Sequence, residues 1–460
     1  VEGTYAALIG GGVDGGIGTS FSAVGGKTYK FSVHIKETGS IGWSGMGLTY
    51  YDASWNELSS SLSDSFSSTY KEYELVAEAP AGTAHINFWL SKNIDGFRMD
   101  VISLISKRLP FEDAVFSDFT ELVEKYYANG PRVHEYLQDL SSATFANYDV
   151  MTVGEGPGIT TDVAPLYIDP KRGELNMIFQ LEHMFLGFGP KGKFDSVETN
   201  LKDLRNILND WNDATDNKGW NNIFLDNHDF ARLVSRWGDD VNYRVESSKL
   251  YALLLLTFKG TPCIYQGSEI GMTNVKFDTI QDYNDVETLN FYDEFVVNGD
   301  VSEVDFMEEV YKSGRDNVRT PMQWDKSKNA GFSTENPWLK INPNYDEINV
   351  EDAIKDKNSI FHFYKDLLDY RRGNETLIYG EYRDLSNNHE HVFVYSRSNE
   401  ELGRGYLVIL NMSSENQSFE YDRFSNFKPI FNNYPNFEVL NKEINLKPWQ
   451  ALLLYNTEDE

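Results

Sequence analysis

The residues best suited to chemistry lie in the run Gly96-Phe97-Arg98-Met99-Asp100-Val101, where an arginine and an aspartate stand two positions apart in an apolar stretch. Side chains of a β-strand alternate between its two faces, so a strand through this run would point Arg98 and Asp100 the same way. The positive charge of Arg98 would then favour the ionised form of Asp100. An ionised carboxylate held in place can act as a nucleophile; the alternative is a structural ion pair.

Three further clusters carry groups that can move protons or hold a polar ligand. Glu155 and the triplet Asn227-His228-Asp229 each follow a short apolar stretch, and Arg315 lies in a long polar segment. Each cluster also has an ordinary interpretation. Glu155 could be a solvated acid in a Gly-Glu-Gly turn, the triplet could cap a helix, and Arg315 could be a surface charge.

The elements that must position these residues are short strands that alternate with helices from about residue 94 onward. Strands are predicted at Phe97–Ile102, Asp149–Gly154, Leu175–Gln180, Asn222–Leu225 and Cys263–Gln266. Helices are predicted over about 131–145, 197–213 and 244–258, and at Ile360–Arg371. This alternation is typical of α/β folds with a parallel sheet, in which active sites gather at the carboxyl ends of the strands. The clusters therefore have the placement needed to share one pocket.

Both ends of the chain have a different pattern, which predicts β-structure alone. Residues 1–93 contain glycine-rich turns and predicted strands at Thr28–Lys36, Gly45–Tyr51, Glu72–Ala77 and His85–Leu90, as expected for a β-sandwich. After Leu377, strands are predicted at His391–Ser396, Tyr406–Asn411 and Gln450–Tyr455. The sequence thus predicts a β-sandwich over 1–93, an α/β region over 94–376 and an antiparallel β-domain over 377–460.

Composition argues against several classes of binding partner and of site. The 460 residues carry a formal net charge of −30, which argues against nucleic acid and anionic membranes as partners. Cys263 is the single cysteine, so the chain has no internal disulfide framework and no cysteine-based metal site. No apolar run reaches membrane-spanning length, and the first residues lack the basic-then-apolar pattern of a signal peptide.

Three runs occur in a fixed order, each around one of the acids: Gly96–Ile102, Val153–Glu155 and Phe224–Asp229. In order and composition they resemble motifs of the α-amylase family, glycoside hydrolase family 13. Three longer runs resemble its oligo-1,6-glucosidase and α-glucosidase branch: Tyr126–His134, Gly260–Met272 and Ser313–Trp324. The resemblance extends from about residue 90 to the C-terminus.

This resemblance implies a retaining, exo-acting α-glucosidase for short α-glucans or isomalto-oligosaccharides. It implies that Asp100 is the nucleophile, that Glu155 is the acid and then the base, and that Asp229 stabilises the oxocarbenium-like transition state. Retention also requires the nucleophile and the acid/base to lie about 5 Å apart. Hydrolysis needs no redox cofactor, and no residue is assigned to a metal.

The resemblance also suggests which residues bind the sugar. It implies that Arg98 and His228 hold the first glucose and that Arg315 recognises its non-reducing end. Val101 directly follows the proposed nucleophile, and in this branch valine at that position accompanies α-1,6 linkages. The alternative is that Val101 is simply a good strand residue.

The resemblance covers only the last five strands of the family's eight-stranded barrel. Residues 1–95 contain no Asp-x-x-x-Asn-His run of the kind that follows the family's third strand. The expected fold is therefore multidomain: an N-terminal β-sandwich, an incomplete (β/α)8 TIM-type barrel and a C-terminal antiparallel β-domain. Such a barrel cannot close by itself, so two alternatives stay open. One is a catalytically impaired sugar-binding remnant, and the other is a partner chain that completes the barrel.

The first 93 residues resemble a carbohydrate-binding module of the β-sandwich type. The resemblance rests on Val24–Val33, Tyr50–Asp52 and Glu78–Thr83. Aromatic residues in this part could stack on sugars or pack in a core: Trp43, Tyr50, Tyr51 and Trp55. The segment Phe97–Leu104 fits either the last strand of such a module or the fourth strand of the barrel. The compartment stays open too, because the enzyme branch favours the cytoplasm and the module favours an extracellular location.

Overall fold

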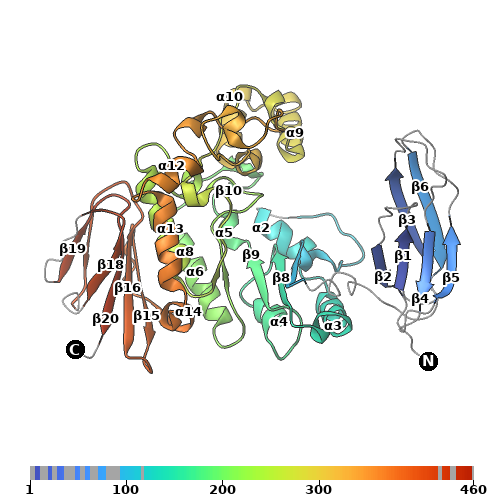
Figure 1. Ribbon diagram of the computed structural model, residues 1–460, viewed down its shortest axis with the longest axis horizontal. Coiled ribbons are helices and arrows are strands. Elements are labelled where there is room, and N and C mark those ends of the chain that lie inside the picture. The colour runs from blue at the N-terminus through green and yellow to red at the C-terminus, as the bar shows by residue number, and fades with distance from the viewer. Residues whose placement is uncertain are drawn as a thin grey trace. The chain divides into compact units, whose positions relative to one another are not determined.

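A computed structural model describes residues 94–115, 119–422, 427–435 and 442–457, and the backbone of six strands before residue 94 (Figure 1). The chain divides into two compact units. The first consists of Val1–Met99, His134–Val153 and Lys171–Leu175, and the second of Asp100–Val133, Gly154–Pro170 and Asn176–Glu460. Each unit is described by itself.

The six N-terminal strands belong to the first unit and form two antiparallel sheets. They are β1 (Ala6–Gly10), β2 (Thr19–Ser22), β3 (Thr28–Ile35), β4 (Gly47–Tyr51), β5 (Glu57–Leu62) and β6 (Lys71–Glu78). One sheet has the order β2-β1-β4-β5, and the other pairs β3 with β6. Strands predicted near β3, β4 and β6 are confirmed. The predicted strand His85–Leu90 and the aromatic residues Trp43 and Trp55 lie outside the described residues, and a sandwich stays a prediction.

The central strands appear in chain order. Strands β7 (Gly96–Met99), β8 (Met151–Gly156) and β9 (Met177–Gln180) form one sheet in this order, and β12 (Asn222–Ile223) pairs in parallel with β13 (Thr261–Pro262). The backbone N–H of Met151 donates to the carbonyl of Asp95 at 2.8 Å. Glycine at position 96 permits this approach, because a Cβ there would lie 1.9 Å from the Met151 carbonyl oxygen. Among the described strands, the strand at Phe97 therefore pairs with β8.

Two predicted strands need correction. The strand predicted over Phe97–Ile102 ends at Met99, because Val101 adopts left-handed angles (φ 37°, ψ 42°) and a 3₁₀ turn follows at Ile102–Leu104. Asp100 thus stands just beyond the strand. The strand predicted at Cys263–Gln266 instead occupies Thr261–Pro262, and the chain then turns toward a second 3₁₀ turn at Ser268–Ile270.

The longer helices confirm the predicted ones: α3 (Val133–Ala143), α6 (Leu201–Thr215), α8 (Arg244–Thr257) and α13 (Ile360–Arg371). Serine and asparagine side chains start two of them, since Asn200 accepts from the Asp203 N–H and Ser359 from the His362 N–H. Shorter elements of the same region are α2 (Phe119–Leu122), α4 (Ala164–Ile168), α5 (Glu182–Phe185), β10 (Phe188–Gly189), β11 (Gly192–Ser196), α7 (Leu233–Trp237) and α14 (Glu375–Tyr379). The polar segment after residue 273 contains α9 (Val286–Tyr292), α10 (Glu303–Ser313), α11 (Asp316–Arg319) and α12 (Val350–Lys355).

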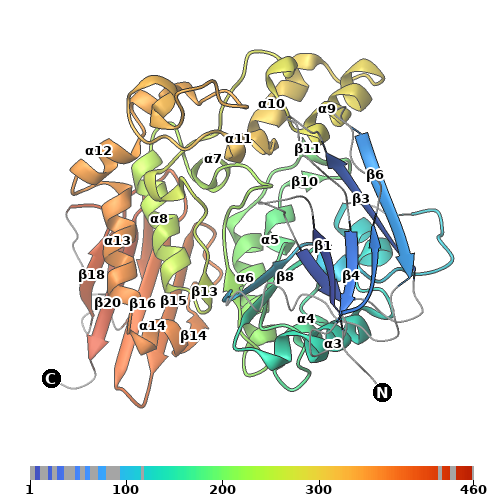
Figure 2. The same ribbon diagram turned by 45° about the vertical axis from the view of Figure 1, so that its right-hand side comes forward.

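The C-terminal strands form an antiparallel sheet of order β14-β15-β16-β20-β18. Its strands are β14 (Glu381–Asp384), β15 (Val392–Asn399), β16 (Arg404–Asn411), β18 (Lys428–Asn432) and β20 (Ala451–Thr457). A separate pair, β17 (Gln417–Glu420) with β19 (Glu443–Leu446), contributes Phe419, Ile444 and Leu446 to a core on one face of the sheet. Figure 2 shows α8 and α13 beside the sheet. The three predicted C-terminal strands are confirmed.

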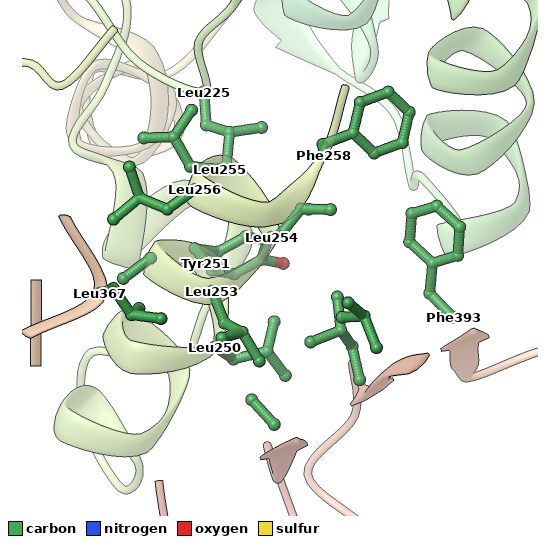
Figure 3. Close-up of a cluster of buried hydrophobic side chains, with 14 of the residues drawn as sticks. Leu225, Leu250, Tyr251, Leu253, Leu254, Leu255, Leu256, Phe258, Leu367 and Phe393 are labelled. Carbon is green, nitrogen blue, oxygen red and sulfur yellow. The ribbon is translucent and has the colours of Figure 1, made fainter. Parts of the chain in front are cut away.

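Helix α8 lies at the centre of the largest described core. Its residues Leu250, Leu253 and Leu254 are fully buried, in one cluster with Leu367 of α13 and Phe393 of β15 (Figure 3). A helix that is apolar all round is expected to be enclosed, as α8 is. No helix among the described residues combines the length and the apolar character needed to span a membrane.

Two buried arginines bind the C-terminal end of α8, Arg397 from the C-terminal sheet and Arg371 from α13. Arg397 of β15 donates to the carbonyls of Thr257 and Gly380, at 2.7 and 2.8 Å. Arg371 of α13 donates to the carbonyl of Leu256 at 2.8 Å. These guanidinium groups meet the negative end of the α8 dipole, where cations are favoured. Desolvation by burial lowers the pKa of Arg397 to about 9.

Candidate active site

Glu155 and the peptide that follows Asp100 are in direct contact. The backbone N–H of Val101 donates to Oε2 of Glu155 at 3.1 Å. Glu155 lies within β8 and is 7% exposed, so the interpretation of a solvated turn acid is wrong. Asp100 is solvent-exposed in the turn after β7. A buried acid and an exposed acid are therefore linked at the ends of neighbouring strands.

The backbone at Val101 is strained. A positive φ is a genuine outlier for a β-branched residue and costs on the order of 1–3 kcal/mol. Here the left-handed angles end β7 and begin the turn whose first N–H reaches Glu155. The alternative that Val101 is simply a good strand residue is wrong. Arg98 is exposed on β7, and since Asp100 lies beyond the strand, strand alternation does not set their relative direction.

The loop after Glu155 is held by the segment that follows Asp100. Ser103 Oγ donates to the carbonyl of Pro157 at 2.7 Å, and Asn129 Nδ2 donates to the carbonyl of Gly158 at 2.7 Å. Tyr167 in turn donates its hydroxyl to Asn129 Oδ1 at 2.8 Å. Asn129 itself adopts a left-handed φ of 53°, which asparagine tolerates well. These bonds fix the end of β8 and therefore the place of Glu155.

Asp229 forms a second cluster, in the turn between β12 and α7. Its Oδ1 lies 2.6 Å from Arg319 Nη2 and 3.5 Å from Arg315 Nη1. His228 Nε2 lies 3.3 Å from its Oδ2. The helix begins only at Leu233, so the interpretation of this triplet as a helix cap is wrong. Three basic side chains thus contact this carboxylate.

Arg315 is held in place from behind by two acids. Its Nη2 lies 2.9 Å from Asp285 Oδ1 and its Nε lies 3.2 Å from Glu287 Oε2. Lys193 pairs with the same Glu287 carboxylate. Burial lowers the pKa of Arg315, but Glu287 and Asp285 outweigh it and raise the pKa overall. Arg315 is therefore a permanently charged part of a network and not an isolated surface charge.

Sequence reasoning missed three members of this network: Asp285, Glu287 and Arg319. Arg319 makes the shortest of the described contacts to Asp229, and its Nε also donates to the carbonyl of His228 at 2.9 Å. The run that contains Arg319 was visible in the sequence. Its partner lies ninety positions earlier, and no local spacing rule connects the two.

Buried polar groups brace the strand ends. His183 lies after β9, and its Nε2 contacts the carbonyl of Phe224 at 2.8 Å while its Nδ1 contacts Gln180 Nε2 at 2.8 Å. Burial lowers the pKa of His183 to about 3, so the ring is neutral. Asp226 follows β12, and Ser268 Oγ donates to it at 2.6 Å. Burial raises the pKa of Asp226 to about 6.

The six candidate residues are thus placed in three ways. Asp100 and Glu155 belong to the first cluster, and His228, Asp229 and Arg315 belong to the second. Arg98 lies on β7. Among the described residues, no group of three or more histidine, cysteine or acidic side chains is arranged to hold a metal ion.

Known proteins resemble this chain over most of its length. Residues 69–380 match the family described as alpha amylase, catalytic domain. The oligo-1,6-glucosidase of Parageobacillus thermoglucosidasius is 46% identical over 374 residues, which cover 80% of this chain and 66% of that protein. The glucan 1,6-alpha-glucosidase of Streptococcus pneumoniae is 42% identical over 371 residues, covering 80% and 65%.

Solved structures give the same picture. The trehalulose synthase of Pseudomonas mesoacidophila superimposes with a TM-score of 0.75 at 36% identity, covering 80% of this chain and 66% of that one. The isomaltulose synthase of Protaminobacter rubrum superimposes with a TM-score of 0.75 at 34% identity, with the same coverage. The chain spans slightly less than two thirds of the length of these relatives. The central region is thus an α-amylase-type barrel region followed by an antiparallel β-sheet domain.

Proposed function

The chain belongs to the α-amylase family, and on this basis we propose that it is a retaining, exo-acting α-glucosidase of short α-glucans and isomalto-oligosaccharides. The observation that carries the proposal is the hydrogen bond from the Val101 N–H to Glu155. It brings the carboxyl in the position of the acid/base to the residue next to the carboxylate in the position of the nucleophile. Retaining hydrolysis requires this neighbourhood.

In the first half of the reaction, a carboxylate oxygen of Asp100 bonds to the anomeric carbon of the terminal glucose. The glycosidic carbon–oxygen bond breaks, and Glu155 gives its proton to the departing oxygen. The shortened sugar leaves, and the glucose stays attached to Asp100 through an ester bond. Asp229, held by Arg319 and Arg315, faces the positive charge that develops on the sugar ring.

In the second half, the Glu155 carboxylate takes a proton from a water molecule. The water oxygen bonds to the anomeric carbon, and the bond to Asp100 breaks. Glucose leaves with its original anomeric configuration, because two inversions cancel. Glu155 is then protonated again and Asp100 is a free carboxylate, so the site is restored.

For the linkage, we propose a preference for α-1,6 bonds. Two relatives support it by name: an oligo-1,6-glucosidase and a glucan 1,6-alpha-glucosidase. Val101 beside the proposed nucleophile fits the same branch. The substrate is thus an oligosaccharide, bound in part by Arg98, His228 and Arg315. These relatives give no support to the alternative of an inactive remnant.

We further propose that residues 1–93 form a sandwich module, that 94–376 form the catalytic region and that 377–460 form the C-terminal domain. Two antiparallel pairings support the sandwich module: β4 with β5, and β3 with β6. A partner chain that completes the barrel is a separate hypothesis, which gel filtration of the active species would test.

The decisive experiment replaces one carboxylate by its amide. We expect Asp100→Asn to abolish release of glucose from isomaltose, because an amide cannot form the glycosyl ester. The matched control is Asp366→Asn on the exposed face of α13, which should retain full activity. Equal activity of the Asp100→Asn variant and the wild type would remove Asp100 from the mechanism.

The substitution Glu155→Gln tests whether Glu155 is the acid that protonates the leaving group. An aryl α-glucoside with an acidic phenol as leaving group needs little protonation, so its cleavage step should be affected less than that of isomaltose. Time courses on both substrates would measure this ratio. If both substrates lost the same fraction of their rate of glycosidic bond cleavage, Glu155 would not be the acid.

A further inference from the structure

A hollow of about 470 Å³ lies on the C-terminal sheet, far along the chain from the candidate active site. We call it the C-terminal hollow. Its floor includes Ser396 and Ser398 of β15, Gly405 of β16 and Asn456 of β20. These residues have small side chains or none, so they leave space over a sheet that is elsewhere covered by large apolar groups.

The register explains why the hollow exists. Ser398 lies opposite Gly405, and Gly405 lies opposite Asn456. Because strand side chains alternate, Ser396 and Ser398 share the face of Val392 and Val394, which belong to the core beneath β17 and β19. That core ends where the small residues begin. Arg397 lies between the two serines and points to the opposite face, where its side chain binds the carbonyl of Thr257.

Open space above the floor is shown directly at Gly405. A Cβ added there would meet no atom of the described residues within 4 Å. The glycine is thus not required by crowding, and a larger side chain would project into the hollow. In a strand, where β-branched residues are favoured, an unneeded glycine marks a place that a ligand or another group can approach closely.

Two aromatic rings line the hollow. Tyr421 follows β17 and Phe427 precedes β18, and both are partly buried. Their ring centroids lie 6.4 Å apart with an interplanar angle of 58°. Aromatic faces combined with hydroxyl and amide groups suit a ligand that has both C–H faces and hydroxyl groups.

Charge excludes the other common ligands. Three charged residues line the hollow: Glu400, Arg404 and Arg397. The guanidinium of Arg397 is engaged by the carbonyls of Thr257 and Gly380, and the whole chain has a net charge of −30. An anion would gain little there. A purely apolar ligand would leave the serine hydroxyls and the Asn456 amide without partners. A neutral, hydroxyl-rich ligand satisfies both the rings and the polar floor.

We propose that the C-terminal hollow is a second, non-catalytic binding site for a neutral saccharide of a few sugar units. Its volume lies within the range of about 300–1,000 Å³ typical of small-molecule sites. The hollow would hold a glucan chain on the enzyme without taking part in its cleavage. This inference goes beyond the proposed function and does not depend on which residue is the nucleophile.

The test is calorimetric titration of the full-length Asp100→Asn chain with isomaltotriose. We expect two binding events per chain. Adding Gly405→Val should remove one event, because valine fills the hollow and fits a strand. Ser418→Val, at an exposed position of β17, is the matched control and should keep both. Amide hydrogen exchange over residues 396–406 should slow with isomaltotriose in the control but not in the Gly405→Val protein.

The outcomes separate this inference from the proposed function. If calorimetry detected a single isomaltotriose binding event and Gly405→Val removed it, the hollow would be supported and the active-site assignment would fail. If Gly405→Val left the number of binding events and the exchange pattern unchanged, the hollow would not be a saccharide site. Phe427→Ala gives a second variant that removes a ring without adding volume, and it should weaken the same event. Retained binding in both variants would overturn the proposal.

Discussion

At the scale of single residues, Val101 carries the strain of the candidate site. Its left-handed backbone is costly for a β-branched side chain, and asparagine is several-fold enriched in this conformation. Strain of this kind persists where the surrounding structure determines it, most often at functional positions. The short turn after β7, in which the Val101 N–H donates to Glu155, is such a position.

We predict that Val101→Asn raises the free energy of unfolding by about 1 kcal/mol, because the left-handed penalty is relieved. Urea unfolding of the wild type and the variant would measure it. Val241→Asn, at a highly exposed position with ordinary backbone angles, should change stability by less than about 0.5 kcal/mol. A loss of stability in Val101→Asn would show that the valine side chain contributes more than its backbone costs.

Arg319 is the residue that most directly positions Asp229. A lysine keeps the charge but cannot contact the Asp229 carboxylate and the His228 carbonyl with a planar fork. Losing one charge-assisted hydrogen bond costs about 1.5–3 kcal/mol.

For Arg319→Lys we therefore predict that kcat on isomaltose falls by roughly 10- to 150-fold, with a smaller change in KM. The control is Arg372→Lys, whose side chain is 82% exposed and which should behave as the wild type. An unchanged kcat would mean that Arg315 and His228 suffice to position Asp229.

At the scale of elements, the ends of β9 and β12 hold two buried groups with opposite pH behaviour. His183 has a native pKa of about 3, below its ordinary value of 6.5. The unfolded chain then binds more protons than the native one between these values, so stability falls as the pH drops below 6.5. Asp226 has a native pKa of about 6, above its ordinary 3.8. Its contribution is present below pH 3.8 and is lost as the pH rises through 6.

We predict that, between pH 6.5 and 5, the wild type loses about 2 kcal/mol of stability relative to His183→Gln. Between pH 7 and 5, it should gain roughly 1 kcal/mol relative to Asp226→Asn. Denaturant unfolding of the three proteins at several pH values would measure both differences. If the free energy of unfolding changed with pH in the same way in the wild type and in His183→Gln, the pKa of His183 would be the same in the native and the unfolded protein.

Sequence patterns predicted elements best where a local signal marks both ends. Helix α13 was predicted with its bounds, because Ser359 caps its start and its apolar positions recur at helical spacing. The end of β7 was not, since nothing in the sequence announces a left-handed valine. Ordered motifs identified Asp100, Glu155 and Asp229 as candidates, but the ion-pair network of Asp285, Glu287 and Arg319 depends on contacts across many residues.

At the scale of the whole molecule, the α/β region and the C-terminal sheet share one core. Apolar residues of α8, α13, β15 and β16 belong to the same buried cluster. Arg397 adds a polar link, because it crosses from β15 to the carbonyls that end α8 and α14. The two parts should therefore unfold together.

We predict that Arg397→Met lowers the free energy of unfolding by about 3 kcal/mol, because the buried carbonyls of Thr257 and Gly380 lose this donor. Thermal unfolding followed by calorimetry would measure it and would also show whether the transition stays single. Arg383→Met, on an exposed position of β14, should leave stability within about 0.5 kcal/mol. If both substitutions changed the free energy of unfolding equally, Arg397 would not stabilise the contact between α8 and the sheet.

The bond from the Val101 N–H to Glu155 belongs to the backbone and not to a side chain. Saturation mutagenesis of codon 101 would therefore leave this donor in place with nineteen amino acids, whatever their size or charge. Proline is the exception, since it has no N–H and its φ is locked near −65°. Side-chain variation at position 101 therefore leaves the contact to Glu155 in place, and proline is the one substitution that removes it.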